Sequence, residues 1–305
     1  MNNTSTCANC GKDEDDSIKL KTCTACKLVK YCSRDCQVAH RPQHKKECKR
    51  RAKELHDEKL FKQPPPLEDC PICFLRMPSL PTGRTYMSCC GKMICTGCLH
   101  APVYDEQGNI VAKKTCSFCR IPTPIAGSDQ ILKQYRKRVE LNDPIAINQM
   151  GSNYAIGGCG LPQDTDKAFE LWNRAGELGS ADAYCNIRLA YQCGQGVDVD
   201  KKKALYYYEL AAMGGDEFAR HDLGETEVQA GNMDRALKHF MIAARDGEHD
   251  SLKNIKTMYK NGYTTKDDYA KALRSYQAYL GEIKSEQRDK AAAFHDDYKY
   301  YESAV

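Results

Sequence analysis

The feature that most constrains this chain is the spacing of its cysteines. Fifteen of the 18 lie within the first 119 residues, and most of them have a partner three or four positions away. A Cys-x2-Cys pair places two thiolates on one tight turn, which suits a tetrahedral zinc ion, and two such pairs complete its ligand shell. We therefore predict that zinc organises the front of the chain. The pairs are Cys7/Cys10, Cys23/Cys26, Cys32/Cys36, Cys70/Cys73, Cys95/Cys98 and Cys116/Cys119.

The wider sequence supports metal ligands over disulfides. The chain has 305 residues, which favours two or three domains, and it contains no apolar run near 18 residues. Residues 1–9 show no signal-peptide pattern, so we expect a soluble, non-secreted protein without a membrane partner. Paired thiols in a reducing compartment are metal ligands more often than disulfides. The basic stretch 45–53 fits a nuclear import signal or the solvated end of a helix, so both cytoplasm and nucleus stay open.

Charge is unevenly distributed along the chain. Basic residues outnumber acidic ones by 25 to 15 in residues 1–142, whereas acidic residues lead by 26 to 20 in residues 143–305. A zinc ion with four thiolates carries about −2 and one with three thiolates and a histidine about −1, so four such sites contribute roughly −7. The basic front half is then mostly counter-charge to metal clusters, which argues against a nucleic-acid partner.

Residues 7–48 carry eight metal-ligand side chains in a regular order. Because so polar a segment cannot build a core, bound metal must supply its folding energy, about 10–16 kcal/mol for a structural zinc. The order and spacing, including Tyr31-Cys32-Ser33 and Cys36-Gln37, resemble the MYND zinc finger. That resemblance implies two interleaved zinc sites. The first is Cys7, Cys10, Cys32 and Cys36, and the second is Cys23, Cys26, His44 and Cys48.

One position departs from the MYND pattern. The family usually has a tryptophan three residues before the ligand histidine, and here that residue is Arg41. MYND fingers bind short proline-containing peptides in a shallow groove, so the resemblance implies such partners, with a specificity altered by this arginine. His40 lies outside the ligand pattern, and we interpret it as a surface residue.

A second block of eight cysteines falls within residues 67–122 and resembles a RING finger. That family alternates its pairs between two zinc ions and so ties distant segments together. By this resemblance Cys70, Cys73, Cys95 and Cys98 hold one ion, and Cys89, Cys90, Cys116 and Cys119 hold the other. The prediction for the whole chain is four zinc ions.

The adjacent pair Cys89-Cys90 is the irregular part of this block. The usual histidine ligand aligns with Lys92, and a protonated lysine cannot bind zinc. Successive residues of a strand point to opposite faces, so two adjacent ligands require a local turn, which Gly91 allows. If only one of the two cysteines binds, His100 is the next candidate ligand.

The RING resemblance implies a function without catalytic residues of its own. In RING ubiquitin ligases an apolar residue matching Ile72 contacts the ubiquitin-conjugating enzyme, and an arginine matching Arg120 contacts that enzyme and ubiquitin. The ligase then positions a reactive thioester. RING-like modules also serve as docking folds. We therefore keep two hypotheses: a RING-type ubiquitin ligase that recruits substrate through its other modules, and a non-enzymatic scaffold that joins several protein partners.

The back half of the chain is repetitive. Ala168, Ala204, Ala236 and Ala272 begin similar helical phrases at spacings of 36, 32 and 36 residues, each preceded by another helix. A period in the mid-thirties built from two helices predicts an α-solenoid. The phrases resemble Sel-like repeats, relatives of the tetratricopeptide repeat, whose curved surface binds proteins.

The predicted fold class is therefore multidomain: two small zinc-stabilised modules followed by an all-α helical-repeat solenoid. The predicted segments are 7–48 (MYND-type finger), 49–66 (charged helix and proline-rich linker), 67–122 (RING-like finger), 129–141 (connecting helix), 142–290 (about four repeats) and 291–305 (tail or capping helix).

Overall fold

The computed structural model describes residues 6–105, 109–110, 115–125 and 127–302. It divides into two compact units, residues 1–62 and 63–305. The smaller unit contains the first zinc module, and the larger one contains the second zinc module and the repeats. No helix in the described part of the chain combines the length and hydropathy needed to span a membrane.

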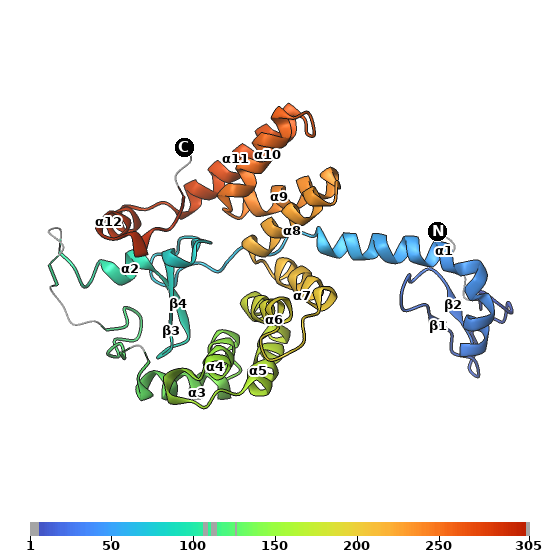
Figure 1. The fold of residues 1–305 in the computed structure, drawn as a ribbon, viewed down its shortest axis with the longest axis horizontal. Coiled ribbons are helices and arrows are strands. Elements are labelled where there is room, and N and C mark those ends of the chain that lie inside the picture. The colour runs from blue at the N-terminus through green and yellow to red at the C-terminus, as the bar shows by residue number, and fades with distance from the viewer. Residues whose placement is uncertain (1–5, 106–108, 111–114, 126, 303–305) are drawn as a thin grey trace. The chain divides into compact units, whose positions relative to one another are not determined.

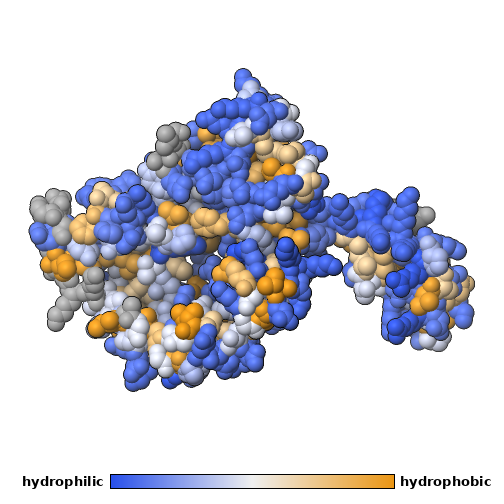
Figure 2. Space-filling view, viewed as in Figure 1, coloured by the Kyte–Doolittle hydropathy of each residue, from blue (hydrophilic) through white to orange (hydrophobic). Residues whose placement is uncertain are grey.

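The smaller unit is built on a short hairpin and one long helix. Strands β1 (Lys21–Thr22) and β2 (Lys30–Tyr31) pair antiparallel, and helix α1 runs from Arg34 to Leu60. The Ser33 hydroxyl caps α1 by accepting a hydrogen bond from the Cys36 N–H. Most of α1 is hydrophilic (Figure 2), and ion pairs one turn apart, such as Arg50 with Glu54, support it. The helix ends before the three prolines at 64–66, as the sequence predicts.

The second zinc module consists of a hairpin and short helical turns. Strands β3 (Arg84–Met87) and β4 (Lys92–Cys95) pair antiparallel, with Arg84 opposite Cys95. A 3-10 turn, Pro81–Gly83, precedes β3, and helix α2 (Thr96–His100) follows β4. The module's core combines cysteines with a few apolar side chains, of which Ile94 is fully buried. So small a core needs metal to hold it together.

Four helix pairs follow a connecting helix, α3 (Asp129–Glu140), which occupies the segment predicted for it. Their second helices contain the four repeated alanines. The pairs are α4 (Pro144–Ile156) with α5 (Thr165–Glu177), α6 (Ala181–Cys193) with α7 (Lys201–Met213), α8 (Glu217–Gln229) with α9 (Met233–Arg245), and α10 (His249–Lys260) with α11 (Lys266–Ile283). A 3-10 turn, Gly158–Gly160, links α4 to α5.

An aromatic residue recurs four positions after each repeated alanine: Trp172, Tyr208, Phe240 and Tyr276. In the first and third pairs it packs on a glycine of the facing helix. A Cβ added to Gly151 would lie 2.7 Å from the Trp172 ring, and one added to Gly224 would lie 2.5 Å from the Phe240 ring. In the second pair Arg188 occupies the facing position, and its guanidinium lies 4.4 Å from the Tyr208 ring centroid. The first three helix pairs therefore share one packing position, which glycine fills in two pairs and arginine in the other.

The repeat helices of the larger unit form an arc, and the second zinc module lies along its inner side (Figure 1). One end of the arc contacts the module through Arg138 of α3, which donates hydrogen bonds to the Ser88 and Cys89 carbonyls. Asp143, the N-cap of α4, accepts a 2.7 Å hydrogen bond from the Tyr86 hydroxyl. The module and the repeats thus form one body.

The other end of the arc closes on the module through the last helices. Helix α12 (Glu286–Phe294) contacts α2, and a 3-10 turn, Asp296–Tyr298, follows it. Tyr300 then packs on Tyr279 and Ile283 of α11. The sequence predicted a tail or capping helix over 291–305; the helix begins at Glu286 and contacts the zinc module as well as the last repeat.

Candidate metal centres

Among the described residues, four groups that contain cysteine place their ligand atoms within 4.8 Å of one another. A tetrahedral zinc ion with Zn–S bonds of about 2.3 Å requires sulfur atoms about 3.8 Å apart. The sulfur–sulfur distances that link members of these groups are 3.4–3.8 Å, so the donors fit zinc in number, type and spacing. The groups are Cys7/Cys10/Cys32/Cys36, Cys23/Cys26/His44/Cys48, Cys70/Cys73/Cys95/Cys98 and Cys89/Cys90/Cys116/Cys119.

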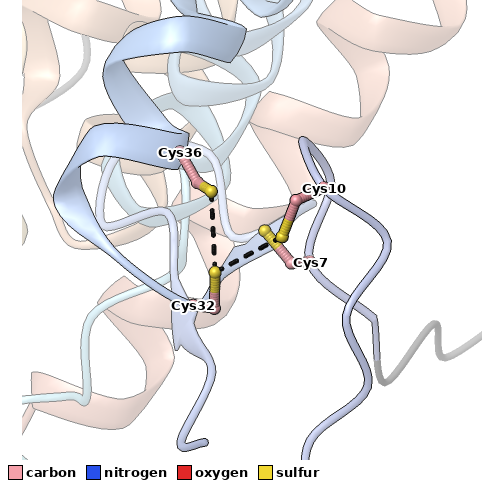
Figure 3. A group of neighbouring side chains, drawn as sticks. All are labelled: Cys7, Cys10, Cys32 and Cys36. Atoms are coloured by element: carbon pink, nitrogen blue, oxygen red, sulfur yellow. Dashed lines mark hydrogen bonds between the residues drawn. The ribbon is translucent and has the colours of Figure 1, made fainter.

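In the first group four sulfur atoms converge from two segments of the chain (Figure 3). Cys7 and Cys10 come from an N-terminal turn, Cys32 follows β2, and Cys36 lies in the first turn of α1. The Cys32 sulfur lies 3.5 Å from that of Cys10 and 3.6 Å from that of Cys36. Metal at this group would fix the start of α1 against the preceding loop.

One backbone turn recurs at four Cys-x2-Cys pairs. The residue after the second cysteine has a positive φ, and its N–H donates to the carbonyl of the first cysteine at 2.8–3.0 Å. Such a turn aims nearby N–H groups at the first sulfur and stabilises a thiolate there. Glycine adopts this conformation freely, but bulkier residues do so rarely. The four residues are Gly11, Lys27, Phe74 and Arg120, with φ of +71°, +59°, +56° and +65°.

In each group, the cysteine that begins such a turn has a lowered pKa. Burial raises the pKa of Cys7 and of Cys23, but backbone hydrogen bonds outweigh it and bring each pKa to about 6. The pKa of Cys70 is lowered mainly by hydrogen bonds from Cys95 and Cys98. For Cys116 the N–H groups of Cys119 and Phe118 overcome burial and lower the pKa. Each group therefore holds at least one thiol that ionises readily, as a zinc ligand must.

The second group contains the single histidine donor. The His44 Nε2 atom lies 3.2 Å from the Cys26 sulfur. His40, which the sequence analysis treats as a surface residue, is half-buried: its ring stacks on His44 at 5.6 Å, and its Nδ1 atom lies 3.0 Å from the Tyr31 hydroxyl. It orients the ligand ring. The i, i+4 spacing of His40 and His44 on a helix was the sequence signal for this contact.

The irregular pair Cys89-Cys90 is resolved by a turn at Gly91, which has φ +70°. The Cys89 sulfur lies 3.4 Å from that of Cys119, and the Cys90 sulfur lies 3.7 Å from that of Cys116. Both cysteines thus face one group. His100, the alternative ligand, lies elsewhere. It is buried, and burial lowers its pKa; its ring stacks on Tyr104 at 4.6 Å and makes a tilted contact with Phe294 at 4.9 Å.

The two residues expected to contact a conjugating enzyme differ in their exposure to solvent. Ile72 is half-buried against the cysteine core of the module, whereas Arg120 is exposed. Two aromatic residues that were not predicted as contact residues are more exposed than Ile72. Phe74 is 76% exposed and Phe118 is 46% exposed, and both lie on zinc turns.

The smaller unit has a groove of about 450 Å³ beside the second group. Tyr31, Val38 and Ala52 supply apolar surface. The other side chains that line it include four basic residues and no acidic one: Arg34, Arg41, Lys45 and Lys49. Arg41 stands where MYND fingers usually have a tryptophan, so the groove combines apolar surface with positive charge.

Comparison with known proteins supports two of the three predicted modules. The family model described as MYND finger matches residues 7–48, and the one described as Sel1 repeat matches residues 144–180 and 183–216. The chain therefore contains a MYND-type zinc finger followed by a Sel1-repeat solenoid, as its sequence patterns predicted. Both kinds of module bind proteins. The likeness of the second zinc module to a RING finger rests on its cysteine groups.

Individual relatives match short segments. A stretch of 48 residues, 16% of the chain, is 46% identical to SET domain and MYND-type zinc finger protein 6 of Schizosaccharomyces pombe and covers 9% of it. Another of 56 residues, 18% of the chain, is 43% identical to E3 ubiquitin-protein ligase DA2 of Arabidopsis thaliana and covers 12% of it. The chain thus spans about a tenth of the length of these relatives. A Sel1 repeat protein from Oxalobacter formigenes is 30% identical over 53% of this chain and 67% of its own, with a TM-score of 0.43.

Proposed function

We propose that this protein is a zinc-dependent ubiquitin ligase of the RING type, in which the four donor groups each bind one zinc ion. The second zinc module recruits a ubiquitin-conjugating enzyme, and the MYND finger and repeats bind the substrate. The observation that carries the proposal is the interleaving of two four-cysteine groups in the second module. Each draws its ligands from well-separated segments, which produces a rigid surface with no open metal position for catalysis.

The surface of the second module supports an enzyme-binding role. Phe74 and Arg120 both carry a large, exposed side chain on a backbone with positive φ. Such a residue costs conformational energy without stabilising a core, and strained positions of this kind concentrate at functional sites. Phe118 adds an exposed aromatic ring on the same zinc turn as Arg120. An apolar anchor beside an arginine is a typical centre of a protein interface.

This function requires no catalytic side chain. The conjugating enzyme carries ubiquitin as a thioester, and the acceptor lysine attacks that bond. A bound ligase restricts the orientation of the thioester, which lowers the entropic part of the barrier. In this proposal the exposed Arg120 donates hydrogen bonds to the bound pair, while Phe74 and Phe118 supply apolar contact area. The 56-residue likeness to a plant ubiquitin ligase is consistent with this assignment.

The groove of the MYND finger suggests the chemistry of a substrate peptide. Its apolar surface suits a proline-containing segment, and its four basic side chains favour acidic residues beside that segment. Charged partners of this kind bind more weakly as salt increases. We expect an acidic, proline-containing peptide to bind the finger and a neutral peptide of the same apolar sequence to bind less tightly.

Autoubiquitination tests the ligase proposal. The full, zinc-loaded chain is incubated with activating enzyme, ubiquitin, ATP and each member of a panel of conjugating enzymes. We expect a ubiquitin ladder with at least one of them. Arg120→Asn and Phe118→Ala should each reduce the rate of ubiquitin-chain formation at least tenfold, because each removes a proposed contact to the conjugating enzyme. Asparagine is chosen at position 120 because it tolerates positive φ, and Phe118 can be truncated because its side chain is 46% exposed.

Val199→Ala is the matched control, because Val199 is a 59% exposed apolar residue in the solenoid. It should leave the rate unchanged, and all variants should retain four zinc ions. Absence of product with every conjugating enzyme would refute ligase activity and leave the non-enzymatic scaffold. The half-buried position of Ile72 favours that alternative, because it reduces the apolar surface open to an enzyme.

A further inference from the structure

Arg288 of α12 contacts a metal group of the second module that is far from it in the sequence. Its side chain is 0% exposed, and it reaches Cys73, which lies 215 residues earlier in the chain. One terminal nitrogen lies 3.6 Å from the Cys73 sulfur and 3.4 Å from the Leu75 carbonyl oxygen. The other donates to the carbonyls of Arg76 and Ile283 at 2.8 and 2.7 Å. One guanidinium thus joins a zinc turn to the end of α11.

A buried guanidinium needs negative charge beside it. Removing a cation from water costs several kcal/mol unless hydrogen bonds and an opposite charge compensate. The hydrogen-bond acceptors that the described structure gives Arg288 are carbonyl oxygens and the sulfur atoms of Cys73 and Cys95, and none is a carboxylate. A zinc ion bound by four thiolates carries a net charge of about −2. The charge that compensates Arg288 is therefore the metal cluster itself.

We propose that zinc in the Cys70/Cys73/Cys95/Cys98 group holds helix α12 on the second zinc module through Arg288. The C-terminal helix is then a clasp that closes only on the metal-loaded module, and Arg288 is a positioning residue of that zinc site. Metal loading fixes the module to the last repeats, so the enzyme-binding and repeat surfaces keep one relative orientation. The inference depends on zinc binding alone and stands whether or not the protein transfers ubiquitin.

The packing around Arg288 shows why its charge decides the docking. The backbones of α2 and α12 approach so closely that a Cβ on Gly97 would lie 2.8 Å from the backbone nitrogen of Arg288. Gln287 adds a weak contact, with its Oε1 atom 3.8 Å from the Cys98 sulfur. At the C-terminal end of α12, Phe294 packs on His100 of α2. The helix therefore cannot slide to expose Arg288 while these contacts hold, and the cation must be compensated in place.

Hydrogen exchange of the full chain tests the clasp. In zinc-loaded protein we expect the amides of residues 286–294 to be protected. Arg288→Met keeps the length of the side chain but removes its charge, and should speed exchange of this segment at least tenfold while residues 144–213 are unchanged. Arg288→Lys, which keeps the charge with fewer donors, should give an intermediate rate. The matched control is Lys290→Met, which removes an exposed cation of the same helix.

The outcomes separate the clasp from ordinary packing. The proposal is wrong if the amides of residues 286–294 exchange equally slowly in the Arg288→Met and Lys290→Met variants while both bind four zinc ions. If Arg288→Met does not retain its zinc, the proposal is tested instead by hydrogen exchange of the wild-type protein during titration with a chelator. Residues 286–294 must then lose protection together with residues 84–98 while α10 stays protected. Persistent protection of 286–294 after residues 84–98 have opened would overturn the clasp.

Discussion

The close approach of helices within a repeat predicts opposite effects for the same substitution at two glycines. Gly224 of α8 faces Phe240, which is fully buried in the core of the third pair. A Cβ at position 224 would lie 2.5 and 2.8 Å from two carbons of that ring, closer than packed atoms allow. Gly281 of α11 is exposed, and nothing lies within 4 Å of its added Cβ.

The magnitudes follow from two terms. Replacing a helical glycine with alanine stabilises a helix by up to about 1 kcal/mol. Overpacking a rigid core costs about 1–3 kcal/mol. Because the added Cβ lies only 2.5 Å from a buried ring, the overpacking cost should be about 2–3 kcal/mol, and Gly224→Ala should lower the free energy of unfolding by about 1–2 kcal/mol. Gly281→Ala, close to the end of its helix, should raise it by roughly 0.5 kcal/mol.

Thermal unfolding of the zinc-saturated protein checks both values. A domain of this size shifts its Tm by about 2–4 °C for each kcal/mol, so the two variants should differ by several degrees. Far-UV circular dichroism suffices, because the signal comes from the repeat helices. Equal melting temperatures for Gly224→Ala and wild type would show that Phe240 can move, and would refute the rigid packing inferred here.

Three further predictions concern charge, metal and the ligand histidine. Burial and the neighbouring Asp216 raise the pKa of Glu217 from 4.5 to about 8; folding favours its protonated form, so this stability is fully present below about pH 4.5 and is lost as the pH rises through about 8. Glu217→Gln should remove this pH-dependent loss of stability and raise the free energy of unfolding at pH 8 by roughly 2–4 kcal/mol. Identical urea midpoints for the variant and the wild type at pH 8 would contradict this prediction. Elemental analysis should give four zinc ions per chain and three for Cys90→Ser; four in the variant would exclude Cys90 as an essential ligand. His40→Ala should speed zinc release to a chromogenic chelator about tenfold or more, without changing the initial zinc count.

The sequence contained enough information for the metal groups and the repeats because both depend on local spacing. A Cys-x2-Cys turn is fixed by four residues, and its geometry follows from the backbone alone. The repeats were visible because each alanine phrase recurs at a nearly constant interval. His44 and Cys48 could be paired because a helix brings positions i and i+4 together.

The contacts that join these parts could not be predicted in the same way. Arg288 and Cys73 are separated by 215 positions, and no local pattern connects an arginine on a C-terminal helix to a zinc turn. The role of His100 was equally hidden, since a histidine near eight cysteines is first considered as a ligand. Only the docking of α12, which brings Phe294 against it, shows it to be an aromatic packing residue.

The second zinc module contacts the solenoid at the turns between its repeats, and the charges there are complementary. Arg76 donates to Asp246, which follows α9, at 3.0 Å and to Glu282 of α11 at 2.8 Å. Arg84 of β3 lowers the pKa of Glu217, at the start of α8, against the effect of burial. Part of the acidic back half of the chain therefore faces arginines of the second zinc module rather than external partners. Proteins that bind the repeats must use surface other than these turns, such as the exposed side of α7 around Tyr206, which is 56% exposed.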